Sequence, residues 1–95
     1  MIDSYINIEK SHKSFDEAFV DLGLNKLVLK NVTNSSQINL VVTSLSKYGE
    51  TKKNLSDFES TNKSFPTLII ADDKDFEQSV DLIQNPLIEL MSSSS

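Results

Sequence analysis

The stretch that decides the fold is FPTLIIADDKDF, Phe65–Phe76. Its run Thr67–Ala71 is apolar without alternation, which is typical of a strand that is covered on both faces of a parallel sheet. Two carboxylates, Asp72 and Asp73, follow the run directly. The apolar residues after them recur at helical spacing and predict a helix over 73–84. A buried strand that leads into a helix indicates an α/β fold.

Working outward, the chain alternates between strand-like and helix-like segments. Alternating residues over Tyr5–Glu9 predict a strand. Ser14 followed by Glu17 forms a capping-box pattern, which marks a helix start. The other expected elements are a helix from this box to Gly23, a strand over 27–32, a helix over 35–48, a loop over 50–64 and a strand over 87–91.

This β-α-β-α-β-α-β order predicts a small, mostly parallel sheet flanked by helices, because parallel neighbours need crossover connections. Residues 1–91 then form a single α/β domain, and 92–95 are a serine tail. We expect Tyr5–Glu9 in the centre, between 27–32 and 67–71. The apolar stripes and the continuous run place four side chains in the core: Phe19, Val42, Ile69 and Ile70.

Composition excludes several classes of function. The 95 residues carry a net charge of −5 and no cysteine. All basic residues are lysines, so the guanidinium forks that grip phosphates are absent, and an acidic domain repels nucleic acid. No apolar run approaches the roughly 20 residues of a membrane span. We therefore expect a cytoplasmic protein with a protein partner, no nucleic acid and no membrane insertion.

Candidate site residues gather where strands are expected to end, because ligands of parallel sheets bind beyond the carboxyl ends of the strands. Asp73 is expected as the N-cap of the following helix, with Asp75 in its first turn. Asp72 is then free to accept a phosphoryl group or, with Glu9, to ligate a hard cation such as Mg²⁺. We expect no other cofactor.

Catalysis is not expected. The single histidine, His12, lies between lysines and is expected to be exposed at the surface. Nucleophilic catalysis needs a nucleophile, a base and an orienting group, and no such set is visible. We assign no catalytic residue and expect no enzyme. A metal-dependent hydrolase would need a histidine or arginine partner for the acidic residues.

Five segments resemble parts of a response-regulator receiver domain, which has a flavodoxin-like fold. These are INIEKSH, FVDLGLNKLVLKNV, INLVVTSL, PTLIIADD and NPLIELMSS. The resemblance implies that Asp72 is the phosphoacceptor, that Ser92 is the hydroxyl residue that senses the phosphoryl group, and that Glu9 is the first residue of a Mg²⁺-binding acidic pair. It also implies two-component signal transduction, with a histidine kinase or another signalling protein as partner.

The chain departs from this pattern. Lys10 stands where the resemblance implies a second acidic residue, and the family's fifth strand with its lysine does not follow. The expected function is therefore a receiver-like signalling or regulatory module that acts through protein–protein contacts without full phosphotransfer competence. A strand order of 2-1-3-4 would favour this interpretation.

A second resemblance leads to an alternative. The segment SFDEAFVDLGLNKLVLKNVTNSSQ, together with FPT at Phe65–Thr67, is similar to a thioredoxin-like domain without redox cysteines. It implies a non-catalytic binding or subunit domain of a larger assembly. A central antiparallel pair of strands would favour it.

Overall fold

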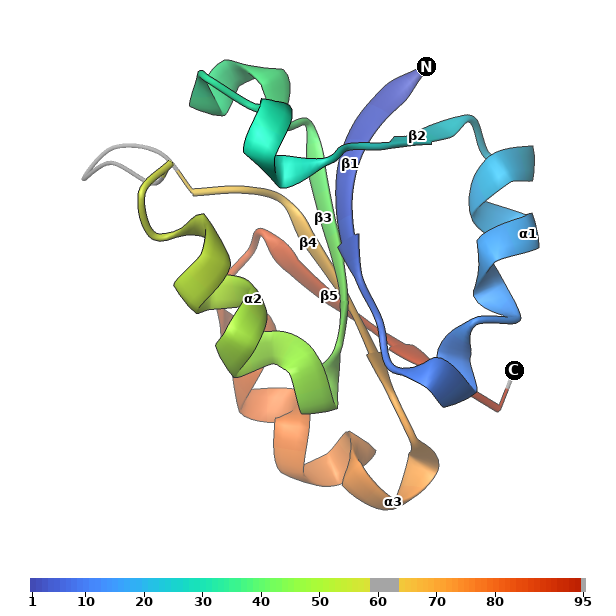
Figure 1. The fold of residues 1–95 in the computed structure, drawn as a ribbon. Coiled ribbons are helices and arrows are strands. Elements are labelled where there is room, and N and C mark those ends of the chain that lie inside the picture. The colour runs from blue at the N-terminus through green and yellow to red at the C-terminus, as the bar shows by residue number, and fades with distance from the viewer. Residues whose placement is uncertain (59–63, 95) are drawn as a thin grey trace.

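The sheet has five parallel strands in the order β2-β1-β3-β4-β5, as seen in the computed structural model, which describes residues 1–58 and 64–94 (Figure 1). The strands are β1 Ile2–Asn7, β2 Leu24–Lys26, β3 Leu40–Ser44, β4 Thr67–Ala71 and β5 Ile88–Ser92. All four pairings are parallel. The fold is a flavodoxin-like α/β arrangement, as expected. The antiparallel pair that would favour the thioredoxin-like alternative does not occur among these pairings.

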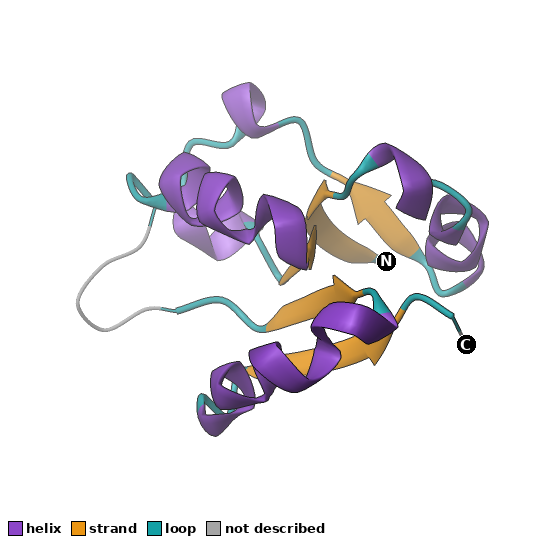
Figure 2. Cartoon of the chain, turned by 90° about the horizontal axis from the view of Figure 1, so that it is seen from below, coloured by secondary structure: helices purple, strands orange, loops and turns teal. Residues whose placement is uncertain are grey.

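Helical segments flank the sheet on both sides (Figures 1 and 2). The α-helices are α1 Phe15–Asp21, α2 Tyr48–Leu55 and α3 Asp73–Phe76, and α3 continues as the 3₁₀ segment η5 Glu77–Gln84. Shorter 3₁₀ turns are η1 Lys10–His12, η2 Leu29–Asn31, η3 Ser35–Gln37 and η4 Leu45–Lys47. Figure 1 places α1 on one side of the sheet, with α2 and α3 on the other. None of the described helices is both long and apolar enough to span a bilayer.

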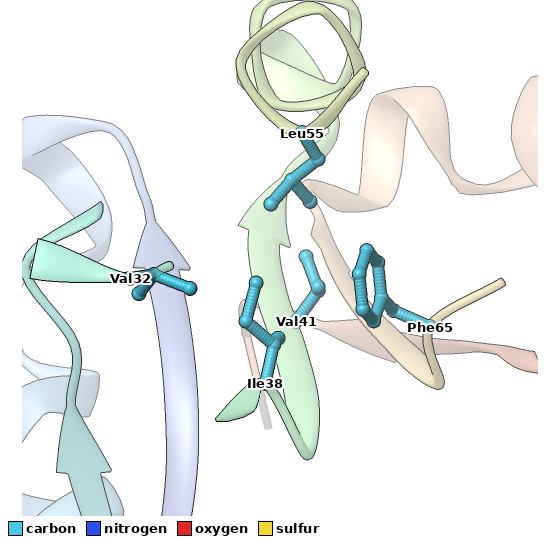
Figure 3. Packing of buried hydrophobic residues seen from close by; sticks show 5 residues of the cluster. All are labelled: Val32, Ile38, Val41, Leu55 and Phe65. Atoms are coloured by element: carbon cyan, nitrogen blue, oxygen red, sulfur yellow. The ribbon is translucent and has the colours of Figure 1, made fainter. Parts of the chain in front are cut away.

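The core consists of one apolar cluster on each face of the sheet. On the α1 face, Phe19 packs with Ile8, Val42 and Ile70. On the α2 face, Leu55 reaches down from its helix toward Val41 and Phe65 (Figure 3). The expected core is confirmed, because Phe19, Val42, Ile69 and Ile70 are at most 4% exposed.

A polar network ties α2 to the sheet. The hydroxyls of Thr43 in β3 and Thr51 in α2 lie 2.8 Å apart. The Asn7 amide of β1 donates to Thr51 Oγ1 at 3.0 Å and to Glu50 Oε2 at 2.9 Å. Buried hydroxyls are stable when they are paired in this way, so the network fixes the start of α2 over β1 and β3.

The stretch around Phe65–Phe76 folds largely as predicted. β4 has the expected bounds Thr67–Ala71, and the chain is helical over 73–84, although most of that segment is 3₁₀. The expected strand over 87–91 is β5, shifted by one residue. The helix before Gly23 is also confirmed, but Ser14 makes no side-chain capping bond.

Three other predictions were wrong. The expected helix over 35–48 contains β3, and the expected loop over 50–64 contains most of α2. The residues expected as a strand over 27–32 form the 3₁₀ turn η2 instead, and the second strand is the shorter β2. The errors over 35–48 and 50–64 have one cause: the strand signal of Leu40–Ser44 was interpreted as half of a helical stripe.

The sheet order differs from the expected one, because β3 was not predicted as a strand. β1 lies between β2 and β3, whereas Thr67–Ala71 pairs with β3 and β5. The centre of the sheet is therefore β3, which explains why Val41, Val42, Thr43 and Ser44 are all buried. Asp72 consequently follows the fourth strand of the chain and not the third.

Candidate functional site

The candidate site lies at the carboxyl edge of the sheet, where the ends of β1, β3, β4 and β5 meet. Glu9 and His12 follow β1, Ser44 is the last residue of β3, and Asp72 follows β4. Figure 1 shows the C-terminal end of the chain beside the turn that follows β1. Parallel strands bring these positions together because all their carboxyl ends point the same way.

The 3₁₀ turn η1 sets the orientation of the first two side chains. It spans Lys10–His12 and is closed by the His12 backbone N–H, which donates to Glu9 O at 2.9 Å. Side chains three residues apart eclipse one another in a 3₁₀ turn, so Glu9 and His12 share a face. The intervening Lys10 is exposed.

His12 is buried, with only 4% of its side chain exposed, and the expectation of a surface histidine is wrong. Its Nε2 lies 2.9 Å from Asp72 Oδ1 and 3.3 Å from Glu9 Oε1. Its Nδ1 lies 2.7 Å from Ser44 Oγ. The edge of the Phe15 ring packs against the imidazole, with 6.3 Å between centroids. His12 thus joins the ends of β1, β3 and β4.

The tautomer of His12 follows from its partners. A carboxylate only accepts hydrogen bonds, so Nε2 carries the hydrogen that points at Asp72. In the neutral ring Nδ1 is then an acceptor, and the Ser44 hydroxyl donates to it. Ser44 Oγ in turn accepts the Glu9 backbone N–H at 2.8 Å.

Hydrogen bonds hold both carboxylates in the ionised form. Hydrogen bonds from Ser46 and then Ser11 lower the pKa of Glu9 below its ordinary value. The hydrogen bond from His12, followed by that from Ser93, lowers the pKa of Asp72. Both groups therefore carry negative charge at neutral pH, and they lie beside a buried imidazole.

The neighbouring Asp73 has a different role from the one expected. The N-cap position of α3 is Asp72, not Asp73, and no side-chain capping bond forms there. Instead Asp73 accepts from Ser92 Oγ at 2.5 Å and from Ser94 Oγ at 2.8 Å, and these bonds lower its pKa. Asp73 thus ties the last described residues of the chain to the start of α3.

The sequence-derived candidates are only partly brought together. Glu9 and Asp72 lie close, since their oxygens and a His12 nitrogen all fall within 4.8 Å of one another. Ser92 contacts Asp73, whereas its neighbour Ser93 donates to Asp72 Oδ1 at 2.7 Å. Sequence reasoning missed His12 and Ser44. The signal for Ser44 was available, because it ends the β-branched run Val41–Thr43.

Ser44, His12 and Asp72 are the residue types of a nucleophile, a base and an orienting acid. Ser44, however, is fully buried, and its hydroxyl is already bonded on two sides. A substrate carbonyl has no access to it. The arrangement therefore holds strand ends together, and the accessible groups are the carboxylates, with 27% of the Glu9 side chain and 40% of the Asp72 side chain exposed.

Fold and site together define a flavodoxin-like α/β protein with a Glu–His–Asp cluster at the carboxyl edge of its sheet. No protein-family model, no curated protein and no solved structure matches the chain.

Proposed function

We propose that this chain is a receiver-like signalling or regulatory module that acts through protein–protein contacts and lacks full phosphotransfer competence. The observation that carries the proposal is the state of Asp72. It lies at a strand end on the edge where parallel sheets bind ligands, yet the oxygen Oδ1 is already bonded to His12 and Ser93.

The charge around Asp72 supports the lack of phosphotransfer. Phosphoryl transfer to a carboxylate needs positive charge, from metal ions or from lysine and arginine, to neutralise the oxygens of the phosphoryl group. Here Lys10 is exposed in η1, and the basic side chain hydrogen-bonded to Asp72 is the imidazole of His12. Ser92, the implied sensor of the phosphoryl group, is bonded to Asp73.

Partner contacts are supported by the uneven cover of the sheet. On the α1 face, Leu40, Leu68 and Met91 are only partly buried. A groove of about 230 Å³ runs beside Leu40 and Leu68 and is bounded by Pro66, Pro86 and Glu89. Partly exposed apolar surface of this kind is typical of contact sites between proteins. Binding or subunit function in a larger assembly would use the same surface.

Treatment with a small acyl phosphate and Mg²⁺, followed by intact-mass measurement, tests the phosphotransfer half of the proposal. We expect wild type, Asp72→Asn and Asp73→Asn to stay equally unmodified. Stoichiometric addition of one phosphoryl group to wild type and to Asp73→Asn, but not to Asp72→Asn, would show a competent receiver instead.

The second part of the proposal, the protein–protein contact, is tested with a partner that is first identified by crosslinking in source cells and then purified. We expect Leu68→Lys to weaken its binding by about tenfold or more, since a charge would enter the apolar surface. Glu17→Gln, an exposed change on α1, is the matched control. If both variants bind the partner as tightly as wild type, the partner contacts another surface, and the apolar surface around Leu68 no longer supports the proposal.

A further inference from the structure

We propose that Glu9, His12 and Asp72 form a binding site for a divalent transition-metal ion of the Zn²⁺ type. The three donor atoms are Glu9 Oε1, His12 Nε2 and Asp72 Oδ1, and they all lie within 4.8 Å of one another. The inference concerns the chemistry of the edge alone and does not depend on which partner the module contacts.

Donor spacing is the first argument. Tetrahedral zinc–nitrogen and zinc–oxygen bonds of about 2.0–2.2 Å place neighbouring ligand atoms about 3.3–3.6 Å apart. The His12 nitrogen lies 2.9 Å from the Asp72 oxygen and 3.3 Å from the Glu9 oxygen. The Glu9 and Asp72 oxygens lie within 4.8 Å of each other, so a metal ion that took the place of the shared hydrogen would draw the two carboxylates inward around it.

The second argument is that every donor is held by a further group. Ser44 bonds to the other ring nitrogen of His12, Ser11 and Ser46 donate to the two Glu9 oxygens at 2.7 and 2.6 Å, and Ser93 donates to Asp72. Metal sites in proteins show this second layer of hydrogen bonds, which fixes the orientation of each ligand. In a chance cluster of side chains we would not expect such hydrogen bonds on all three donors.

Metal binding also changes which hydrogens lie between His12 and Ser44. When Nε2 binds the ion, the ring hydrogen moves to Nδ1 and is donated to Ser44 Oγ. That oxygen has two lone pairs, so it accepts from Nδ1 and from the Glu9 backbone N–H together, and its own hydroxyl hydrogen rotates away from the ring. The ring keeps one hydrogen through this change of tautomer. The ion neutralises the two adjacent carboxylates.

The donor set selects the type of ion. Mg²⁺ prefers oxygen ligands in octahedral geometry, whereas an imidazole nitrogen with two carboxylates suits Zn²⁺ and its neighbours in the first transition row. His12 closes the inner side of the site, and the partly exposed carboxylates leave the outer side open. Water or an external ligand would complete the coordination there, as in open zinc sites.

Zn²⁺ titration of the full chain by calorimetry tests the site, after treatment with EDTA to remove bound ions. We expect one equivalent to bind, and Glu9→Gln and Asp72→Asn each to weaken the affinity by about tenfold or more. Asp73→Asn is the matched control and should bind like wild type. Circular dichroism on each variant verifies that it is folded.

NMR of the ring nitrogens supplies a readout that does not depend on the variants. Zn²⁺ should shift Nε2 of His12 and convert the ring to the Nδ1–H tautomer, while equimolar Mg²⁺ should leave the ring unchanged. The proposal is overturned if the His12 nitrogens do not respond to saturating Zn²⁺, or if Glu9→Gln and Asp72→Asn bind the ion as tightly as wild type.

Discussion

His12 and Asp72 are 60 residues apart in the chain, yet the imidazole Nε2 and the carboxylate Oδ1 lie 2.9 Å apart. Their hydrogen bond joins the turn after β1 to the start of α3. Since Nδ1 of the same ring meets Ser44 at the end of β3, one side chain connects three strand ends. This connection has consequences for stability that can be measured without any ligand.

Removing the imidazole should destabilise the fold. We expect His12→Ala, measured by urea denaturation in EDTA, to lower the free energy of unfolding by about 2–4 kcal/mol, because it leaves a cavity and a buried Ser44 hydroxyl without its partner. Lys13→Ala, next to it but exposed, should change stability by no more than about 0.5 kcal/mol. Equal effects of the two substitutions would mean that His12 does not hold the strand ends.

Truncating the core should be more costly. Phe19 is 4% exposed and Ile69 is 0% exposed. We expect Phe19→Ala and Ile69→Ala each to cost about 2–5 kcal/mol, a large share of the stability of a small domain. Val20→Ala is the control on the same helix, since Val20 is 72% exposed. Losses below about 1 kcal/mol at both core positions would contradict the packing described here.

The two glycines should respond to alanine with opposite signs. Gly23 has φ of +80°, and a Cβ there would meet nothing within 4 Å, so Gly23→Ala should cost about 1 kcal/mol through backbone strain alone. Gly49 lies in α2 with equally open space, so Gly49→Ala should stabilise by about 0.5–1 kcal/mol. Thermal melts of both variants verify the contrast, and a shift of the same sign in both would refute it.

Stability should fall on the acid side through the carboxylates of the edge. The folded state lowers the pKa of Glu9, Asp72 and Asp73 from ordinary values of 4.5, 3.8 and 3.8. A lowered folded pKa contributes stability that is fully present above the unfolded pKa and is lost as pH falls through the folded one. We expect urea midpoints in EDTA to decline below about pH 4.

The matching variants separate this effect from general acid unfolding. In the double variant Glu9→Gln/Asp73→Asn the decline should be shallower than in wild type, because fewer carboxylates take up a proton when the chain unfolds in acid. Glu17→Gln, an exposed carboxylate on α1, is the control. Parallel curves for wild type and the double variant would show that the hydrogen bonds from the serines do not stabilise the ionised groups.

The sequence predicted the parts of the fold whose signals are local. Thr67–Ala71 is a run too short for a helix and is followed by turn-forming aspartates, so β4 was predicted with its bounds. The stretch Leu40–Ser44 has equally branched residues, but Ile38 and Leu45 complete a helical spacing around it. A strand that is buried on both faces shows no alternation of apolar and polar residues, so periodicity alone could not distinguish a strand from a helix here.

For the site, too, the sequence predicted only the residues whose signals are local. Glu9 and Asp72 were predicted together because parallel strand ends meet at one edge. His12 was not, because its burial arises from Ser44 and Asp72, which are 32 and 60 residues distant. Lysines on both sides of a histidine indicate an exposed loop, and only the 3₁₀ turn directs the ring inward while the lysines stay outside. A correct position for β3 would have placed Ser44 at the same edge.

The all-parallel sheet also determines how the molecule resists a pulling force. The chain enters at the amino end of β1 and leaves at the carboxyl end of β5, three neighbours away in the sheet. Traction on the two termini therefore slides β1 and β5 in opposite directions along their own axes. The ladders between β1, β3, β4 and β5 are loaded in shear, so the hydrogen bonds of each ladder share the force and break together and not one after another. Mechanical strength in this direction is a property of the strand order, while the ladder to β2 lies outside the line of force.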